Sequence, residues 1–279
     1  SLLSGKASGV NINQVNSEPG GLLTVSVRGA GSINSSNSVL VVIDGLPGGN
    51  MANINPADIE SIEILKDASA AAIYGTRAAN GVILVTTKKG TEGATQVSYN
   101  GYAAFQTPSY KFDVLNATQY LQMINDISVD AGKPAPYTEA EIAAAGEGTD
   151  WQEELFRNAW AINHQFSING GSKQSKYYAS LGFHNQDGIL ISSNFKKYNA
   201  LINLELNPGE KFKFGINING NLNIKDKIAN ESNAGNENAD PLNAALMFDP
   251  RLSPKKNENG EYEKNPSIAL DNPIALAYG

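Results

Sequence analysis

Residues 59–90 constrain the fold of this chain more than any other segment. They read IESIEILKDASAAAIYGTRAANGVILVTTKKG. Apolar and polar residues alternate over Ile59–Leu65, which predicts a half-buried strand. Ala68–Tyr74 has strong helix propensity, and Asp67 can cap that helix by accepting from free backbone N–H groups. The β-branched run Val82–Thr87 predicts a second strand, so the segment is expected to fold as strand, short helix and strand.

A second pattern begins near residue 95, where apolar and polar residues alternate strictly over about five segments. In the clearest segment the apolar members are Phe212, Phe214, Ile216, Ile218, Leu222 and Ile224. A period of two sends alternate side chains to opposite faces of a sheet. The antiparallel sheets of soluble sandwiches show the same alternation, so the pattern alone fits two classes of β protein.

The connections between these segments differ in length. The turns at 170–175 and 207–210 are tight, whereas 108–160 and the stretch from about 225 are long and polar. Membrane barrels alternate short periplasmic turns with long external loops, and compact sandwiches rarely need structureless links of this length. The lengths therefore favour a barrel.

Composition excludes several classes of protein. The 279 residues carry a net charge of −7, which argues against a nucleic-acid partner. The absence of cysteine excludes a disulfide framework and a thiolate metal site. The sequence has no apolar run long enough for a membrane-spanning helix, although a barrel strand needs only about 9–11 alternating residues. The start, SLLSGKASG, is not a signal peptide, so the targeting segment of an exported protein would lie outside this chain.

Several segments share a family resemblance. Residues 5–12 (GKASGVNI), 25–47 (VSVRGAGSINSSNSVLVVIDGLP) and 59–90 resemble, in order and spacing, the plug domain of SusC/RagA-type TonB-dependent outer-membrane transporters. Residues 116–126, 149–157 and 166–189 are similar to the first barrel segments of the same family. The resemblance implies an α+β plug domain over residues 1–92. It also implies that residues 93–279 begin a large antiparallel transmembrane β-barrel.

Barrels of this family are of the plugged class with roughly 22 strands. A five-stranded sheet cannot close, and an open edge in lipid leaves backbone groups unpaired. We therefore expect the chain to be a fragment of a longer polypeptide.

The resemblance also implies a function and its partners. We expect TonB-dependent active import of an oligosaccharide, or of a peptide, across the bacterial outer membrane by a multi-pass β-barrel. A SusD-like surface lipoprotein would capture the cargo, and TonB would bind a segment upstream of Ser1. The barrel would contact outer-membrane lipid, and no cofactor is expected. The alternative is a surface or secreted β-rich binding module without transport activity.

No catalytic, cofactor or metal site is expected. The glycine clusters around residues 29–31 and 45–49 do not form a phosphate-binding motif. The two histidines, His164 and His184, lie on different predicted strands, and no nucleophile stands beside a base. The sequence therefore does not predict an enzyme.

Charged residues of the plug are candidates for contacts with the barrel wall that hold the plug yet let it rearrange. These candidates are Arg28, Asp44, Glu63, Lys66, Asp67 and Arg77. Asp44 also fits a turn residue after an apolar strand, and the remaining side chains also fit a solvated surface.

Aromatic residues in or beside the first long link are candidates for substrate contact, because flat rings stack on sugar faces. They are Tyr110, Tyr137, Trp151 and Trp160. The same residues suit an aromatic girdle at the bilayer edge or local packing, and we favour that interpretation.

Overall fold

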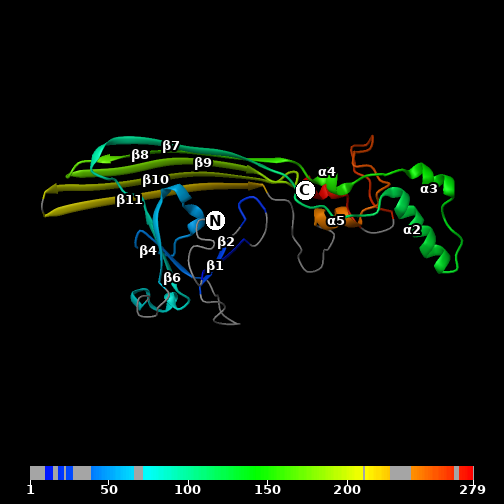
Figure 1. Ribbon diagram of the computed structural model, residues 1–279, viewed down its shortest axis with the longest axis horizontal. Coiled ribbons are helices and arrows are strands. Elements are labelled where there is room, and N and C mark those ends of the chain that lie inside the picture. Colours follow the sequence, from blue (N-terminus) through cyan, green and yellow to red (C-terminus); the bar gives the residue numbers. More distant parts are fainter. Residues whose placement is uncertain are drawn as a thin grey trace. The chain divides into compact units, whose positions relative to one another are not determined.

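The computed structural model describes residues 10–14, 18–21, 23–27, 39–65, 72–209, 211–226, 240–266 and 270–278 (Figure 1). The chain divides into two compact units. The first comprises residues 1–104, 161–186 and 195–225, and the second comprises residues 105–160, 187–194 and 226–279. Among the described helices, none combines the length and the apolar character needed to cross a bilayer.

A four-stranded sheet, here the small sheet, lies in the first unit. Its strands follow the order β4-β3-β6-β5. They are β3 (Leu40–Ile43), β4 (Leu46–Pro47), β5 (Ile59–Leu65) and β6 (Val82–Thr87). β3 runs parallel to β6, whereas β5 runs antiparallel to it. The two strands predicted over 59–65 and 82–87 are confirmed. A separate antiparallel pair joins β1 (Val10–Gln14) to β2 (Leu23–Val27).

Most of the helix expected over 68–74 lies outside the described residues. Residues 66–71 lie outside the described part, and the rest forms 3-10 turns, η3 (Ala72–Ala78). Gly75 lies inside η3 with φ of 66°, a backbone conformation that glycine adopts without steric cost. The described end of this segment is therefore a pair of 3-10 turns joined at this glycine.

β6 is the most buried strand of the small sheet and contributes to a cluster on each of its faces. Val42, Val82 and Ala78 form one cluster, and Ile83 and Val85 form another with Ile54. β6 is almost continuously apolar because its neighbours cover both of its faces. Two short 3-10 turns, η1 (Met51–Asn53) and η2 (Pro56–Asp58), precede β5.

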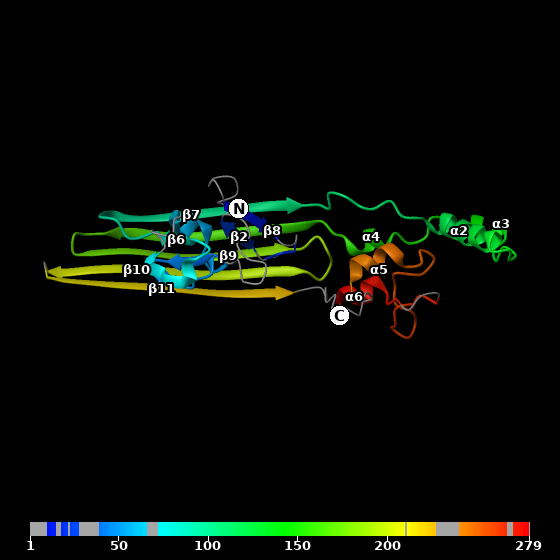
Figure 2. The same cartoon turned by 90° about the horizontal axis from the view of Figure 1, so that it is seen from below.

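Five long antiparallel strands, here the long sheet, follow in the order β11-β10-β9-β8-β7 (Figure 2). They are β7 (Gly93–Gln106), β8 (Ala159–Gly171), β9 (Ser175–Asp187), β10 (Asn194–Gly209) and β11 (Phe212–Asp226). The register pairs Phe166 with Leu181 and Gln165 with Gly182. The alternation predicted from residue 95 onward is thus confirmed.

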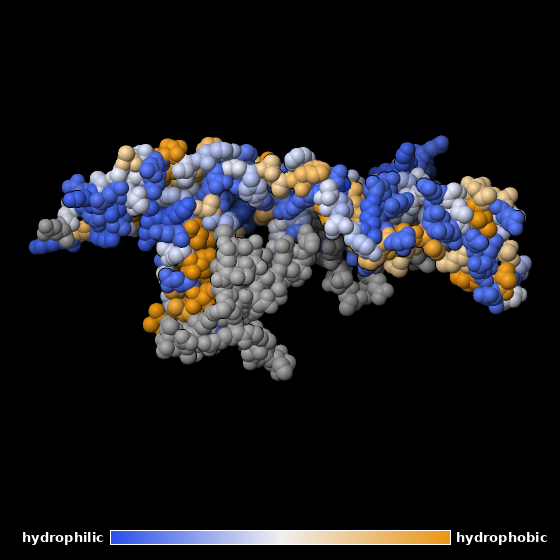
Figure 3. Space-filling model, viewed as in Figure 1, coloured by the Kyte–Doolittle hydropathy of each residue, from blue (hydrophilic) through white to orange (hydrophobic). Residues whose placement is uncertain are grey.

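The burial of the long sheet is the reverse of that in a soluble protein. On one face, Leu181 is 65% exposed and Phe166 57% exposed, and in Figure 3 apolar residues reach the surface along the upper side of the strands. On the other face, Gln165, Ser180 and Asn203 are buried. We call these the apolar face and the polar face.

The second unit has a helical core. Its helices are α2 (Ala117–Asp130), α3 (Glu139–Ala145), α4 (Trp151–Leu155), α5 (Pro241–Met247) and α6 (Pro273–Tyr278). Trp151 and Leu155 pack against Ala244 and Phe248 in this core. The long link 108–160 is therefore folded, and α2 begins at a capping box between Asn116 and Gln119.

Candidate functional site

A buried carboxylate joins the segment before β5 to the polar face of the long sheet. Asp58 is 2% exposed, and its Oδ1 accepts hydrogen bonds from Gln165 Nε2 at 2.5 Å and from the Tyr178 hydroxyl at 2.8 Å. Gln165 and Tyr178 are each 3% exposed. These three residues form the Asp58 cluster. Because a buried carboxylate without partners is costly, the two donors fix the position of this segment.

Local sequence places Asp58 at this point. Asn55 caps η2 by accepting from the Ala57 N–H at 3.1 Å, and Pro56 occupies the first position of the turn. The turn ends at Asp58, immediately before β5. Gly182 on β9 leaves room for the capping residue Asn55, because a Cβ on Gly182 would lie 2.7 Å from Asn55 Nδ2.

A lysine from β10 reaches the same segment. Lys197 Nζ donates to the carbonyl oxygens of Ala52, at 2.5 Å, and Ile54, at 3.2 Å. Its charge also attracts that of Asp58. Three neighbouring strands, β8, β9 and β10, therefore hold residues 52–58 with donors from their polar face.

A second carboxylate links the small sheet to β10 and β11. Asp44 lies in a turn with φ of 48° and accepts from Thr87 through its N–H, at 2.9 Å, and its hydroxyl, at 2.6 Å. Asn217 Nδ2 donates to Asp44 Oδ2 at 2.7 Å, and Asn203 Nδ2 donates to Thr87 Oγ1 at 2.9 Å. These four residues form the Asp44 cluster. Asn217 is exposed, whereas Thr87 is fully buried.

Further polar contacts join the N-terminal part to the long sheet. Together with the Asp58 and Asp44 clusters, we call them the seam. Lys225 Nζ lies 2.9 Å from Glu18 Oε2, and Asn221 Nδ2 lies 3.3 Å from Asn53 Oδ1. Donors on the long sheet thus meet acceptors on the N-terminal part at several separate points. Such contacts fix register while contributing modest net stability each.

A hollow of about 190 Å³ borders the Asp44 cluster. Its lining comes from both sheets and comprises Asp44, Lys89, Gly90, Lys176, Asn203, Leu204, Glu205, Gly215, Ile216 and Asn217. Ion pairs reach the hollow at Lys176 with Glu92, 3.3 Å apart, and Glu205 with Lys213, 3.0 Å apart. The lining is therefore more charged than that around Asp58.

The structure assigns different places to the charged candidates. Of the six, Asp44 lies in the seam. Glu63 and Arg77 are exposed on the N-terminal part. The remaining three, Arg28, Lys66 and Asp67, lie outside the described residues.

The sequence-based prediction missed the Asp58 cluster. Asp58 follows Asn55 and Pro56, a cap-and-turn signature. Gln165 and Tyr178 alternate with outward apolar residues, which marked them for the polar face. No signal indicated that this aspartate would meet those two side chains across the fold.

The aromatic candidates also differ in position. Trp151 is 2% exposed, donates from Nε1 to the Asp249 carbonyl at 3.1 Å and packs edge-on against Phe248. The helical core covers the ring of Trp151, which agrees with the favoured interpretation of local packing. Trp160 is 53% exposed and lies beside Phe105, with 5.0 Å between ring centroids. Tyr110 is 71% exposed.

Tyr137 belongs to a polar contact within the second unit. Its hydroxyl accepts from Arg251 Nη1 at 2.9 Å, and Arg251 also pairs with the buried Asp249 at 2.6 Å. Hydrogen bonding to Asp249 raises the pKa of Arg251 above its ordinary value. Burial, followed by the charge of Asp249, raises the pKa of the nearby Tyr120. Arg251 therefore stays charged and joins the segment after α5 to the segment after α2.

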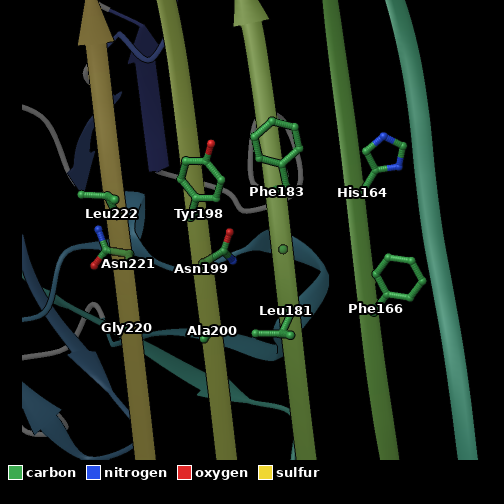
Figure 4. Close-up of a pocket in the computed structure, with 11 residues that line it drawn as sticks. His164, Phe166, Leu181, Phe183, Tyr198, Asn199, Ala200, Gly220, Asn221 and Leu222 are labelled. Carbon is green, nitrogen blue, oxygen red and sulfur yellow. The ribbon is translucent and has the colours of Figure 1, made fainter.

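The apolar face has a shallow hollow of about 470 Å³. Figure 4 shows Leu181 and Phe183 projecting from β9 and Tyr198 from β10, with the small residues Ala200 on β10 and Gly220 on β11 beside them. At its edge His164 Nδ1 lies 2.7 Å from the Tyr99 hydroxyl. In the described part of the chain, no group of three or more His, Cys, Asp or Glu residues could hold a metal ion.

Comparisons with known proteins match both parts of the chain. The family model described as TonB-dependent Receptor Plug Domain matches residues 1–82. TonB-dependent receptor SusC of Bacteroides thetaiotaomicron is 40% identical over 92% of this chain and 25% of its own length. TonB-dependent receptor P3 of Formosa agariphila is 38% identical over 99% of this chain and 26% of its own. The chain thus spans about a quarter of the length of these curated relatives.

A solved structure supports the same assignment of the fold. The RagAB peptide importer in its 'closed-closed' state aligns with a TM-score of 0.76 and 25% identity. The alignment covers 97% of this chain and 34% of that one.

Proposed function

Because the chain belongs to the SusC/RagA-type TonB-dependent receptors, we propose that it supplies the plug and first barrel strands of an outer-membrane nutrient importer. In this proposal residues 1–92 are the plug, and the long sheet from residue 93 is the start of the barrel wall. One observation carries the proposal: the wall binds the plug with its polar face and exposes its apolar face. That arrangement suits a sheet with lipid on one side and a plugged, hydrated lumen on the other.

The seam explains how a plug can be both seated and movable. The described polar contacts across it are hydrogen bonds and an ion pair between side chains of the plug and the wall. Water can replace such contacts as they break, so force can shift the plug without unfolding the wall. The outer membrane has no ATP, and TonB, bound upstream of Ser1, would deliver that force.

The cargo is an oligosaccharide or a peptide, captured by a SusD-like lipoprotein at the cell surface. The similarity to the RagAB peptide importer favours keeping the peptide alternative. The exposed ring of Tyr110 is available for stacking on a sugar face. The related proteins are a receptor and an importer, so we propose that this chain is not an enzyme.

The rival function is a surface or secreted binding module. Such a module would have to cover the apolar face with other protein to remain in water. Exposed apolar residues recur along β8 to β11, including Phe166, Leu181, Ile202 and Ile218. A face of this length is expected in lipid and disfavours the module.

Uptake by the full-length receptor tests the proposal. Cells expressing the receptor with its lipoprotein would be given a pool of neutral oligosaccharides or a pool of short peptides, and the periplasmic contents would be identified by mass spectrometry. The proposal predicts receptor-dependent uptake of one pool, lost on deletion of TonB. Uptake that persists without TonB, or a receptor extracted from cells without detergent, contradicts it.

A further inference from the structure

Two pairs of plug strands differ in the direction of their pairing. β1 and β2 are antiparallel, so Val10 at the start of β1 lies opposite Val27 at the end of β2. β3 and β6 are parallel, so Leu40 lies opposite Val82 and the two strands begin at the same end. A pull that TonB applies upstream of Ser1 reaches β1 first and β3 later, because the chain passes through them in that order.

The far end of β6 is fixed to the wall. β6 ends at Thr87, and β7, the first strand of the wall, begins at Gly93. Asn203 on β10 donates from Nδ2 to Thr87 Oγ1 at 2.9 Å, and Asn169 on β8 accepts from the Thr91 N–H at 2.9 Å. The chain beyond β6 is therefore held covalently and by two inner strands of the long sheet, and it resists a pull from the N-terminus.

The register of β1 and β2 makes this pair easy to open by force. Tension passes through the pair at Val10 and Val27, which lie directly opposite each other. Opposite residues of an antiparallel pair are about 4.5–5.5 Å apart, so the tension acts across the strands. The paired positions then separate one after another, and each step breaks few hydrogen bonds.

β3 and β6 carry the same tension along their length. The tension enters β3 at Leu40 and leaves β6 at Thr87, which lie at opposite corners of the pair. Each residue of a strand advances about 3.3 Å, whereas neighbouring strands lie only about 4.8 Å apart, so these corners are separated mainly along the strands. Sliding β3 over β6 must therefore break all of their paired positions together. It must also move Val42 and Val82 out of their buried cluster.

We propose that the small sheet is a mechanical stop that limits how much of the plug TonB can withdraw. β1 and β2 separate under the pull, whereas β3 stays paired with β6 and residues 40–92 stay on the wall. The importer then opens by withdrawal of the segment before β3, and that segment returns to a sheet that has remained intact. This inference rests on the proposed function and adds the part of the plug that yields.

Paired cysteines in the full-length receptor test the proposal, with any other cysteines replaced. Ile12→Cys with Val25→Cys joins β1 to β2, and Leu40→Cys with Val82→Cys joins β3 to β6, because each pair is directly opposite in its register. Paired strands bring such positions within the Cα separation that a disulfide requires. Each double variant is compared with itself after reduction, and thiol labelling measures the fraction linked. The four single variants are controls.

Uptake of whichever pool enters parent cells is the first measurement. The proposal predicts that uptake falls in proportion to the fraction linked between residues 12 and 25, and that reduction restores it. Receptor linked between residues 40 and 82 should retain the uptake of its reduced form. The proposal is overturned if the link between 40 and 82 stops uptake, or if the link between 12 and 25 leaves it unchanged.

Force measurements on single receptors in nanodiscs, pulled from a handle upstream of Ser1, need no cargo. Opening of residues 10–27 should add about 60 Å of extended chain before any event at higher force. The link between 12 and 25 should remove most of this extension, and the link between 40 and 82 should leave it unchanged. A first extension that the link between 40 and 82 abolishes would overturn the inference. A parent receptor that takes up neither pool overturns the proposed function, and the pulling record then still decides whether the small sheet is the stop.

Discussion

The hydroxyl of Tyr178 lies 2.8 Å from Asp58 Oδ1, although the two residues are separated by 120 positions in the sequence. The tyrosine belongs to β9 and the aspartate to the plug segment before β5. Both are buried, so this bond connects the plug to the wall without exposure to solvent.

Tyr178→Phe removes this donor and leaves Asp58 with Gln165 as its remaining wall donor in the cluster. A hydrogen bond to a charged group contributes about 1.5–3 kcal/mol. The free energy of opening residues 52–58 should therefore fall by that amount. Hydrogen–deuterium exchange of the full-length receptor measures the opening. Tyr198→Phe is the matched control, because Tyr198 is 43% exposed on the apolar face. Equal protection of residues 52–58 in both variants would contradict the role given to Tyr178.

Substitution of Asp58 should loosen the plug in a graded way. Asp58→Ala leaves buried donors of Gln165 and Tyr178 unsatisfied, at about 1–3 kcal/mol, whereas Asp58→Asn keeps one acceptor oxygen. We expect passive entry of a large antibiotic such as vancomycin to rise most in the alanine variant and less in the asparagine variant. Tyr198→Phe, on the apolar face, should not change entry. The order of the two Asp58 variants is the decisive comparison, and its reversal would count against the bonds described.

Gly90→Ala should disturb the junction between plug and wall. An added Cβ would collide with backbone atoms of Lys176 and Tyr177 on β9, which cannot move aside as a flexible side chain can. Overpacking of this kind costs about 1–3 kcal/mol. The yield of folded receptor in outer membranes should fall, whereas Gly215→Ala, with no atom within 4 Å of the new Cβ, should retain it. Normal yield of the Gly90 variant would show that the strands separate there more readily than the structure indicates.

Two aromatic substitutions separate packing from substrate contact in the second unit. Trp151→Ala removes a ring from the helical core and should destabilise that unit by about 3–5 kcal/mol, seen as faster proteolysis between residues 107 and 158. Tyr110→Ala changes an exposed side chain and should leave proteolysis unchanged. If Tyr110 contacts cargo, Tyr110→Ala should lower uptake without changing proteolysis. A protease-resistant Trp151 variant would refute its place in the core.

The start of α3 should weaken in acid. Hydrogen bonds from the Thr138 backbone and hydroxyl lower the pKa of Glu141, which stabilises the capping box when the carboxylate is charged. A lowered folded-state pKa means that this stabilisation is present above the unfolded pKa and is lost as the pH falls through the folded value. Exchange of amides 139–145 should therefore accelerate below the ordinary glutamate range. Glu141→Gln should remove that pH dependence, and an unchanged profile in the variant would contradict the assignment.

Much of the fold could be predicted from local patterns. The strands at 59–65 and 82–87 follow from alternation and β-branching, and the faces of β8 to β11 follow from a period of two. The α2 start follows from Asn116 and Gln119. These features depend on residues close in sequence, where backbone geometry fixes which side chains share a face.

The seam could not be predicted in the same way. Charge suggested six plug residues as wall contacts, yet the wall donors described around Asp58 and Asp44 include neutral amide and hydroxyl groups from distant strands. Trp151 was predicted beside a loop because 108–160 reads as polar, but segments after β11 cover its ring. Both outcomes depend on tertiary register, which a single sequence does not specify.

The central claim is that the polar face of the long sheet meets a plugged, water-filled lumen while the apolar face meets lipid. Single cysteines at neighbouring positions of β11 test it most directly in native outer membranes carrying the full-length receptor. The account predicts that Asn219→Cys reacts with a water-soluble maleimide. It also predicts that a bimane label on Ile218→Cys is quenched by nitroxide lipids. Quenching at residue 219 with aqueous reactivity at residue 218, or no lipid quenching at either residue, would contradict it.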